Sequence, residues 1–174
     1  MCIRDSYSAK GCRVLLLALY DGQLTDEALT AERLHISLIL LANKIRAEAP
    51  GTFAWFAREG VSVRVISGDN PVTVSAVAAQ AGIEGAEQWV DARELKTDQD
   101  IAKAVRQYTV FGRVVPNQKR KIVRALQSQG RTVAMTGDGV NDVLALKDAD
   151  CGIALASGAE AACHAAQLVL LNSD

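Results

Sequence analysis

The 174-residue sequence has few aromatic side chains, almost no net charge and no long apolar run. Aromatic residues make up 5% of the chain, and its formal charge is −1 at pH 7. A nearly neutral chain exerts no overall attraction on nucleic acid or anionic lipid, so neither is expected as a partner. No apolar run reaches the roughly 18 residues that a membrane-spanning helix needs. Apolar residues nevertheless make up 49% of the chain, enough for the core of one globular domain.

The four cysteines form no C-x-x-C pair and have no metal-ligand spacing, which gives no support to a zinc site or a disulfide framework. Reduced thiols in a cytosolic compartment fit this pattern best. The opening residues Met1 to Ser6 lack the apolar core and the cleavage site of a signal peptide. This start resembles a truncated or mis-started reading frame, and we expect residues 1–8 to be non-native or disordered.

Strand-like apolar runs alternate with amphipathic helical patterns along most of the chain. Proline in the first turn and glycine after the last turn mark several of the helices. From about residue 50 onward this alternation predicts an α/β fold, in which helices cover both faces of a parallel sheet. We expect strands at 14–19, 36–41, 62–66, 109–111, 131–135, 151–155 and 167–171, and helices at 50–59, 71–82, 98–108, 116–130 and 140–147.

The segment Thr136 to Asp142 follows the apolar run that ends at Met135, and it carries two carboxylates four positions apart. Glycines at 137 and 139 permit a tight turn, and Asp138 and Asp142 supply the oxygen ligands that Mg²⁺ prefers. An Asp-Gly pair by itself is more often only a turn. The functional interpretation, phosphoryl chemistry, therefore depends on the other motifs.

A second loop of the same type, Ser67-Gly68-Asp69, follows another predicted strand. In an open parallel sheet the ligand crevice lies beyond the carboxyl ends of the strands, so both loops are expected at one site. Ser67 and nearby backbone N–H groups can donate to phosphate oxygens, and Asp69 can accept from a sugar hydroxyl or a lysine.

Carboxylates beside a phosphate need a balancing cation, and Arg113 and Lys119 are the candidates. The helix dipole disfavours Lys119 in a first turn, so its position favours a role facing an anion. Arg120, Lys121 and Arg124 are interpreted as a solvated helix face. The lack of interleaved aromatic residues disfavours nucleic-acid binding by this basic group. The acidic run that precedes this helix in the chain, Asp91, Glu94, Asp98 and Asp100, is expected to be a solvated connector.

These motifs resemble the phosphorylation domain of cation-transporting P-type ATPases, which belong to the haloacid-dehalogenase-like superfamily. The resemblance covers about residues 10–174. It implies a Rossmann-like fold, with 1–42 as a C-terminal remnant of a nucleotide-binding domain and 43–174 as the phosphorylation domain. The segments that carry it are Val65 to Asn70, Phe111 to Lys119, Met135 to Asp142, Ala145-Leu146-Lys147 and Ala149-Asp150.

The resemblance also implies a role for each candidate residue, with ATP as the substrate and Mg²⁺ as the cofactor. Asp138 is the implied Mg²⁺ ligand, and Asp69 and Arg113 are implied to serve the nucleotide. Lys119 is implied to stabilise the developing charge. The residues implied to hold the phosphoryl group and its surroundings are Ser67, Gly68, Asn141 and Asp142. The parent would be a multi-pass pump with this part at the cytosolic face and the transported cation in its absent transmembrane domain.

The sequence departs from that family in one decisive respect, because it contains no Asp-Lys-Thr-Gly-Thr segment and hence no nucleophile. In the family the strand that carries this aspartate lies in the middle of the sheet. We therefore expect the chain to have unpaired strand edges and a hydrophobic gap. At the expected hinge, Asn43 and Lys44 replace a frequent aspartate and proline. Two alternatives stay open: a free-standing phosphatase of the same superfamily, and a non-catalytic module that binds nucleotide or Mg²⁺.

Overall fold

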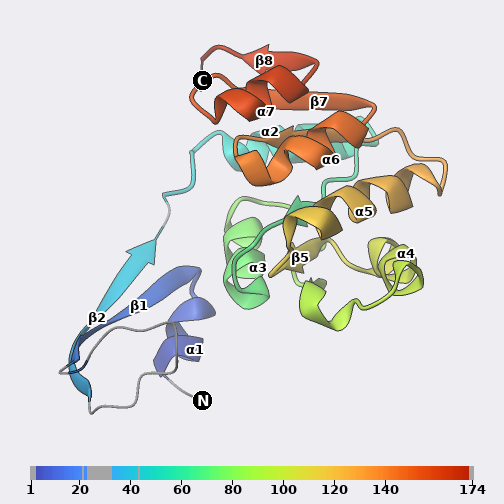
Figure 1. Ribbon diagram of the computed structural model, residues 1–174. Helices are drawn as coiled ribbons and strands as arrows, with labels where there is room; N and C mark the ends of the chain where they lie inside the picture. The colour runs from blue at the N-terminus through green and yellow to red at the C-terminus, as the bar shows by residue number, and fades with distance from the viewer. Residues whose placement is uncertain (1–2, 21, 23–32, 43, 173–174) are drawn as a thin grey trace.

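The computed structural model describes residues 3–20, 22, 33–42 and 44–172. The expected hinge residue Asn43 and residues 1 and 2 lie outside this description. Figure 1 shows a body of helices and strands, from which a long hairpin projects. Among the described residues no helix combines the length and the apolar character that crossing a membrane requires.

The elements alternate between strand and helix from α2 to β8. Their order is α1 Ile3–Ser8, β1 Cys12–Tyr20, β2 Arg33–Ala42, α2 Ala49–Arg58, β3 Val65–Ile66, α3 Pro71–Gln80, β4 Trp89–Asp91, a 3₁₀ turn η1 Ala92–Glu94, α4 Asp98–Gln107, β5 Val110–Gly112, α5 Pro116–Gln127, β6 Ala134–Gly137, a second 3₁₀ turn η2 Val140–Asp142, α6 Val143–Asp148, β7 Cys151–Leu155, α7 Glu160–Ala165 and β8 Leu168–Leu170.

Two elements differ from the expectations drawn from the sequence. Residues Ile3–Ser8, within the segment expected to be non-native or disordered, form the helix α1. The strand β4 was not expected, because its three residues lie in a polar and acidic stretch without alternation. The other predicted strands and helices are present; β7 has the predicted bounds, and the others have shifted ends.

The first parallel sheet has the strand order β3-β5-β4, and helices cover both of its faces. Neighbouring residues of β5 point to opposite faces, as the two-residue period of a strand requires. Phe111 packs into a core with Ile122 of α5 and residues of α4, such as Val105. Val110 packs with Ala78 of α3. The predicted arrangement of helices on both faces is therefore confirmed for this sheet.

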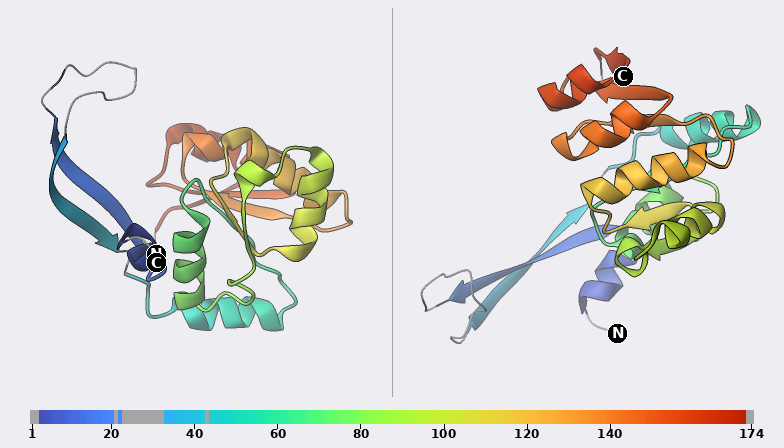
Figure 2. Two further views of the ribbon diagram at one scale, coloured as in Figure 1. Left: turned by 90° about the horizontal axis from the view of Figure 1, so that it is seen from below. Right: turned by 45° about the vertical axis from the view of Figure 1, so that its right-hand side comes forward.

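The second parallel sheet has the order β6-β7-β8. Met135 of β6 and Ala154 of β7 pack with Leu146 of α6 and Ala162 of α7. Val123 of α5 belongs to this core as well. The helix α5 thus contributes side chains to the cores of both sheets, and the two views in Figure 2 show it between them.

The expected continuous sheet is divided in two, with β3 at the end of one part and β6 at the end of the other. Within the described residues, each of these two strands pairs with a neighbour on one side only. These are the unpaired edges that a missing central strand predicts.

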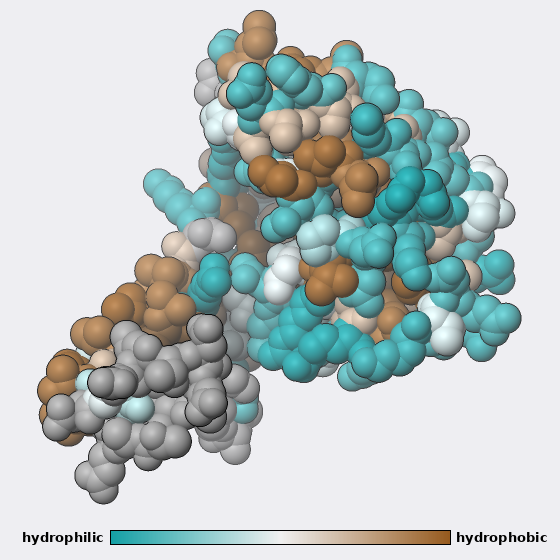
Figure 3. Space-filling view, in the orientation of Figure 1, coloured by the Kyte–Doolittle hydropathy of each residue, from teal (hydrophilic) through white to brown (hydrophobic). Residues whose placement is uncertain are grey.

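The hairpin β1–β2 forms a separate antiparallel pair that runs from Cys12↔Ala42 to Tyr20↔Arg33, with a register shift between Leu17 and Ala18. Figures 1 and 2 show that it extends away from the body. In Figure 3 much of its surface is hydrophobic. Its exposed large apolar residues are Leu15, Leu16, Leu17, Leu19, Leu34, Ile36, Leu38, Ile39, Leu40 and Leu41.

Candidate active site

The loop after β3 holds Ser67, Gly68 and Asp69 at the carboxyl end of the first sheet. The Ser67 side-chain oxygen accepts a hydrogen bond from the Asp69 N–H at 3.1 Å, so the hydroxyl hydrogen is available to another acceptor. Asn70 then caps α3 by accepting from the Val72 N–H at 3.0 Å. Ser67 is half-buried, whereas Gly68 and Asp69 are exposed.

The loop after β5 is hydrogen-bonded to the loop after β3. The Arg113 N–H donates to the Asp69 carbonyl at 2.8 Å, and the Val114 N–H donates to the Ser67 carbonyl at 3.0 Å. Arg113 adopts a positive φ of 54°, which is uncommon for a residue with a side chain. A Cβ added at Gly112 would lie 2.4 Å from the Pro71 Cα, so only glycine fits at this close approach.

Lys119, in the first turn of α5, makes an ion pair with Asp142 beyond β6. The distance from Lys119 Nζ to Asp142 Oδ1 is 2.6 Å, and the two side chains are 13% and 10% exposed. The other oxygen of Asp142 accepts from the Gly139 N–H at 3.2 Å. Such a largely buried pair needs both charges, because either charge alone would lose water without compensation.

The turn after β6 depends on two glycines. A Cβ at Gly137 would lie 2.6 Å from the Asp142 Cβ, and a Cβ at Gly158 would lie 2.5 Å from the Asp138 carbonyl oxygen. That carbonyl also accepts from the Ala159 N–H at 2.7 Å. The segment after β7, Gly158-Ala159, therefore holds the backbone of Asp138, a positioning role that sequence reasoning did not assign. The sequence feature that could have indicated this role is the run of small residues directly after the predicted strand 151–155.

These contacts join the two loops at the carboxyl ends of both sheets. Val114 is bonded to Ser67 on one side, and five residues later Lys119 is bonded to Asp142 on the other. The start of α5 therefore bridges the two predicted phosphate-binding loops. Asp138 and Asn141 are exposed in the turn after β6.

The candidate active site contains only some of the ligands that a metal ion would need. Within the part of the chain that the structure describes, no group of three His, Cys, Asp or Glu side chains could hold a metal ion. Asp138 is exposed and no hydrogen bond or ion pair of the described residues engages its carboxylate, whereas both oxygens of Asp142 accept hydrogen bonds. Mg²⁺ is often held by one or two carboxylates with water and phosphate oxygens, so Asp138 fits one position of such a site.

Arg113 points its guanidinium group at Asp91, the last residue of β4. Arg113 Nη1 donates to Asp91 Oδ2 at 2.8 Å, and the side chain of Arg93 donates to both oxygens of the same carboxylate. Hydrogen bonds from Arg93, and then from Arg113, hold the pKa of Asp91 well below its usual range. The interpretation of Asp91 as part of a solvated connector is wrong, because this residue is only 8% exposed.

The basic face of α5 is also more structured than expected. Arg120 and Arg124 both reach Asp148 at the end of α6, at 2.5 and 2.6 Å, and Lys121 pairs with the exposed Asp98 at 2.7 Å. Hydrogen bonds from Arg120 and Arg124 lower the pKa of Asp148. The prediction of a solvated face is therefore wrong for Arg120, which fastens α5 to α6.

Residues 7–150 match the haloacid dehalogenase-like hydrolase family. The chain belongs to this family, in agreement with its parallel sheets and flanking helices.

Cation-transporting ATPases are among the proteins to which this chain is similar, which confirms the resemblance predicted from the motifs. The chain is 51% identical over 170 residues to the calcium-transporting ATPase CtpE of Mycobacterium tuberculosis, covering 97% of the chain and 21% of that relative. It is 41% identical over 167 residues to the probable cation-transporting ATPase exp7 of Streptococcus pneumoniae, covering 95% and 21%. It is 35% identical over 177 residues to the magnesium-transporting ATPase, P-type 1, of Salmonella typhimurium, covering 98% and 20%. The chain thus spans about a fifth of the length of these relatives.

Proposed function

We propose that the chain forms most of the phosphorylation domain of an ATP-driven cation pump. It would lie at the cytosolic face of a membrane, with residues 1–42 as the end of the nucleotide-binding domain. The observation that carries the proposal is the bridge at the start of α5, which links the Ser67 loop to the Lys119–Asp142 pair. Lys119, the two loops and the exposed carboxylates of Asp69 and Asp138 would then lie together at the carboxyl ends of both sheets.

Each candidate residue has a task that its geometry permits. Lys119 Nζ has three hydrogens and gives one to Asp142, so two remain for phosphate oxygens. The Ser67 hydroxyl and the Gly68 N–H donate to the same phosphoryl group. Asp142 positions Lys119, and Asn141 borders the site beside it. Mg²⁺ held at Asp138 would supply charge neutralisation, and Asp69 with Arg113 would border the nucleotide.

The reaction needs an acceptor from the absent part of the parent protein. Its aspartate carboxylate attacks the γ-phosphorus of ATP, a P–O bond forms, and the bond to the leaving ADP oxygen breaks. Water later hydrolyses the acyl phosphate and releases inorganic phosphate. The residues described above hold the three equatorial oxygens while this transfer takes place.

The test uses the longer reading frame that contains this chain. We expect it to encode an Asp-Lys-Thr-Gly-Thr segment and membrane-spanning helices upstream. Membranes that carry this protein should take up the γ-phosphate of ATP as an acid-stable, hydroxylamine-sensitive label when Mg²⁺ is present. Lys119→Met should slow the labelling by about 10²-fold or more, because it removes a preorganised cation. Arg106→Gln, on the exposed side of α4, should leave the rate unchanged.

Two outcomes would overturn the proposal. An upstream sequence without that segment and without membrane-spanning helices is the first. Steady release of phosphate from small phosphomonoesters by the isolated chain with Mg²⁺ is the second, because it would point to a free-standing phosphatase with its own nucleophile.

A further inference from the structure

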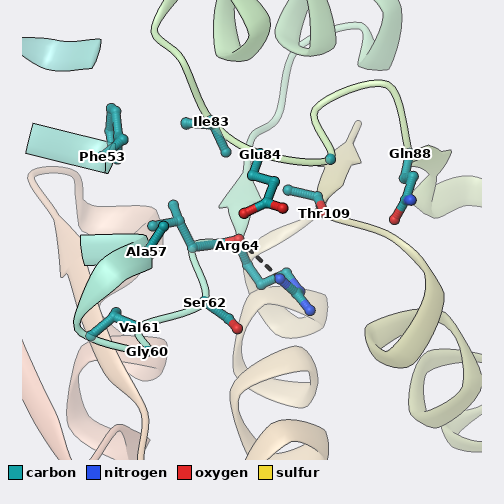
Figure 4. A pocket seen from close by; sticks show the side chains of 12 residues that line it. Phe53, Ala57, Gly60, Val61, Ser62, Arg64, Ile83, Glu84, Gln88 and Thr109 are labelled. Atoms are coloured by element: carbon teal, nitrogen blue, oxygen red, sulfur yellow. Dashed lines mark hydrogen bonds between the residues drawn. The ribbon is translucent and has the colours of Figure 1, made fainter. Parts of the chain in front are cut away.

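A cavity lies at the edge of the first sheet opposite the candidate active site. Its volume is about 390 Å³, within the range of small-molecule sites. Arg64, Thr109 and Gln88 line it directly before β3, β5 and β4, that is, at the amino ends of the three strands. The end of α2 and the loop after α3 close its sides, as Figure 4 shows.

Arg64 is the cation of this cavity, and its hydrogen-bonding capacity is largely unused. Among the residues that the structure describes, its buried Nε has no hydrogen-bond partner, and Nη1 donates to the carbonyl of its own neighbour, Val63, at 3.0 Å. No ion pair engages the guanidinium group within the described residues. Burial lowers the pKa of Arg64, and the charge of Arg131 before β6 lowers it further. Arg64 is half-buried, and a half-buried cation beside a second cation is stabilised by an anion.

The remaining walls indicate what kind of anion fits. The side chains of Ser62, Thr109 and Gln88 offer neutral donors around Arg64, while Phe53 and Ile83 offer apolar surface. Glu84 also lines the cavity, and its carboxylate repels a doubly charged group more strongly than a singly charged one. A single carboxylate on an apolar body matches this combination better than a phosphate dianion.

We propose that this cavity is a second ligand site, for a small organic carboxylate whose charged group binds Arg64 and whose apolar body lies against Phe53 and Ile83. Arg64 lies at the amino ends of the strands, whereas the loops of the phosphoryl chemistry lie at the carboxyl ends. Phe53 and Ile83 also line the neighbouring cavity that reaches Ser67. The second ligand site does not depend on the proposed function.

Benzoate is a suitable probe, and benzyl alcohol is its uncharged counterpart. The isolated chain is titrated with each compound. Binding is followed by NMR through the amide signals of Gly60, Gly85 and Thr109, which lie at the cavity. Signals of Gly68 and Gly137 report on the candidate active site. We expect saturable shifts of the cavity signals with benzoate, and binding at least about tenfold weaker with benzyl alcohol, because a charge-assisted hydrogen bond is lost.

Three variants sharpen this test. Arg64→Gln should weaken benzoate binding by about tenfold or more. Glu84→Gln should strengthen it by about threefold, because a like charge is removed. Arg106→Gln, on the exposed side of α4, should not change it.

The proposal is overturned if benzoate causes no saturable shift at the cavity, or if its shifts occur only at Gly68 and Gly137. Equal affinities for benzoate and benzyl alcohol in the unmodified chain would also overturn it, even where Arg64→Gln does not fold.

Discussion

The ion pair between Lys119 and Asp142 is a single contact on which the candidate active site and local stability both depend. Replacing Lys119 with methionine leaves a buried carboxylate without its cation. Breaking a buried pair in this way costs about 3–5 kcal/mol of the free energy of unfolding. We expect that loss for Lys119→Met in urea-induced unfolding. The double variant Lys119→Met/Asp142→Asn should recover most of it, and a cost below about 1 kcal/mol for the single change would contradict the buried pairing.

Asp91 should make the free energy of unfolding depend on pH in the acidic range. Its folded pKa lies below the unfolded value of about 3.9, so its stabilisation is present above about pH 4 and is lost as the pH falls further. Asp91→Asn should lower the free energy of unfolding by about 1–3 kcal/mol at pH 7, and this difference should shrink below about pH 4. Asp98→Asn is the control, since the Asp98 side chain is 80% exposed and its pair with Lys121 contributes little. A pH-independent effect of Asp91→Asn would refute the assignment.

The sequence did not predict which charged residues of the site pair with one another. The motifs placed Ser67 and Asp138 directly after strands and Lys119 in the first turn of a helix, as the structure does, because glycines, prolines and neighbouring apolar runs are local signals. The partner of Arg113 is 22 positions away, in a three-residue strand without a recognisable pattern. A contact of this kind depends on how strands pair, and that information is not local.

Close approaches between elements depend on glycine at positions that the sequence alone presents as ordinary turns. Gly112→Ala would place a Cβ 2.4 Å from the Pro71 Cα at the start of α3, and backbone must shift to accept it. We expect a loss of about 1–3 kcal/mol in thermal or urea unfolding. Gly51→Ala in α2 is a matched control, because a Cβ there meets nothing within 4 Å and alanine favours the helix. An equal loss in both variants would contradict the packing argument.

The hairpin β1–β2 is apolar on both faces, which is typical of strands covered on both sides. Left exposed, such a surface promotes self-association. The paired residues Leu16 and Leu38 are 54% and 42% exposed, and we expect Leu16→Thr/Leu38→Thr to shift the chain toward the monomer in light scattering. Leu144→Thr, at a position 44% exposed on α6, should have little effect. Unchanged self-association of the hairpin variant would show that another surface is responsible.

At the scale of the whole molecule, the sequence predicted the class of fold and the presence of unpaired strand edges, which the structure shows at β3 and β6. It did not predict where the sheet divides, because β3 has only two residues and pairs with β5 across more than forty positions. The division leaves the two sheets with cores that differ in the size of their buried side chains. The first contains Phe111, Ile122 and Val105, whereas the second depends heavily on alanines such as Ala145 and Ala154.

Because α5 packs into both cores, it couples the stability of one half of the molecule to that of the other. Ile122 is fully buried in one core, and its neighbour Val123, 1% exposed, lies in the other. The alanine-rich half buries less apolar surface, so its amides should exchange with deuterium sooner than those of β5. Val123→Ala should widen this difference and Ile122→Ala should narrow it. Uniform exchange in every variant would mean that the chain opens as one cooperative unit.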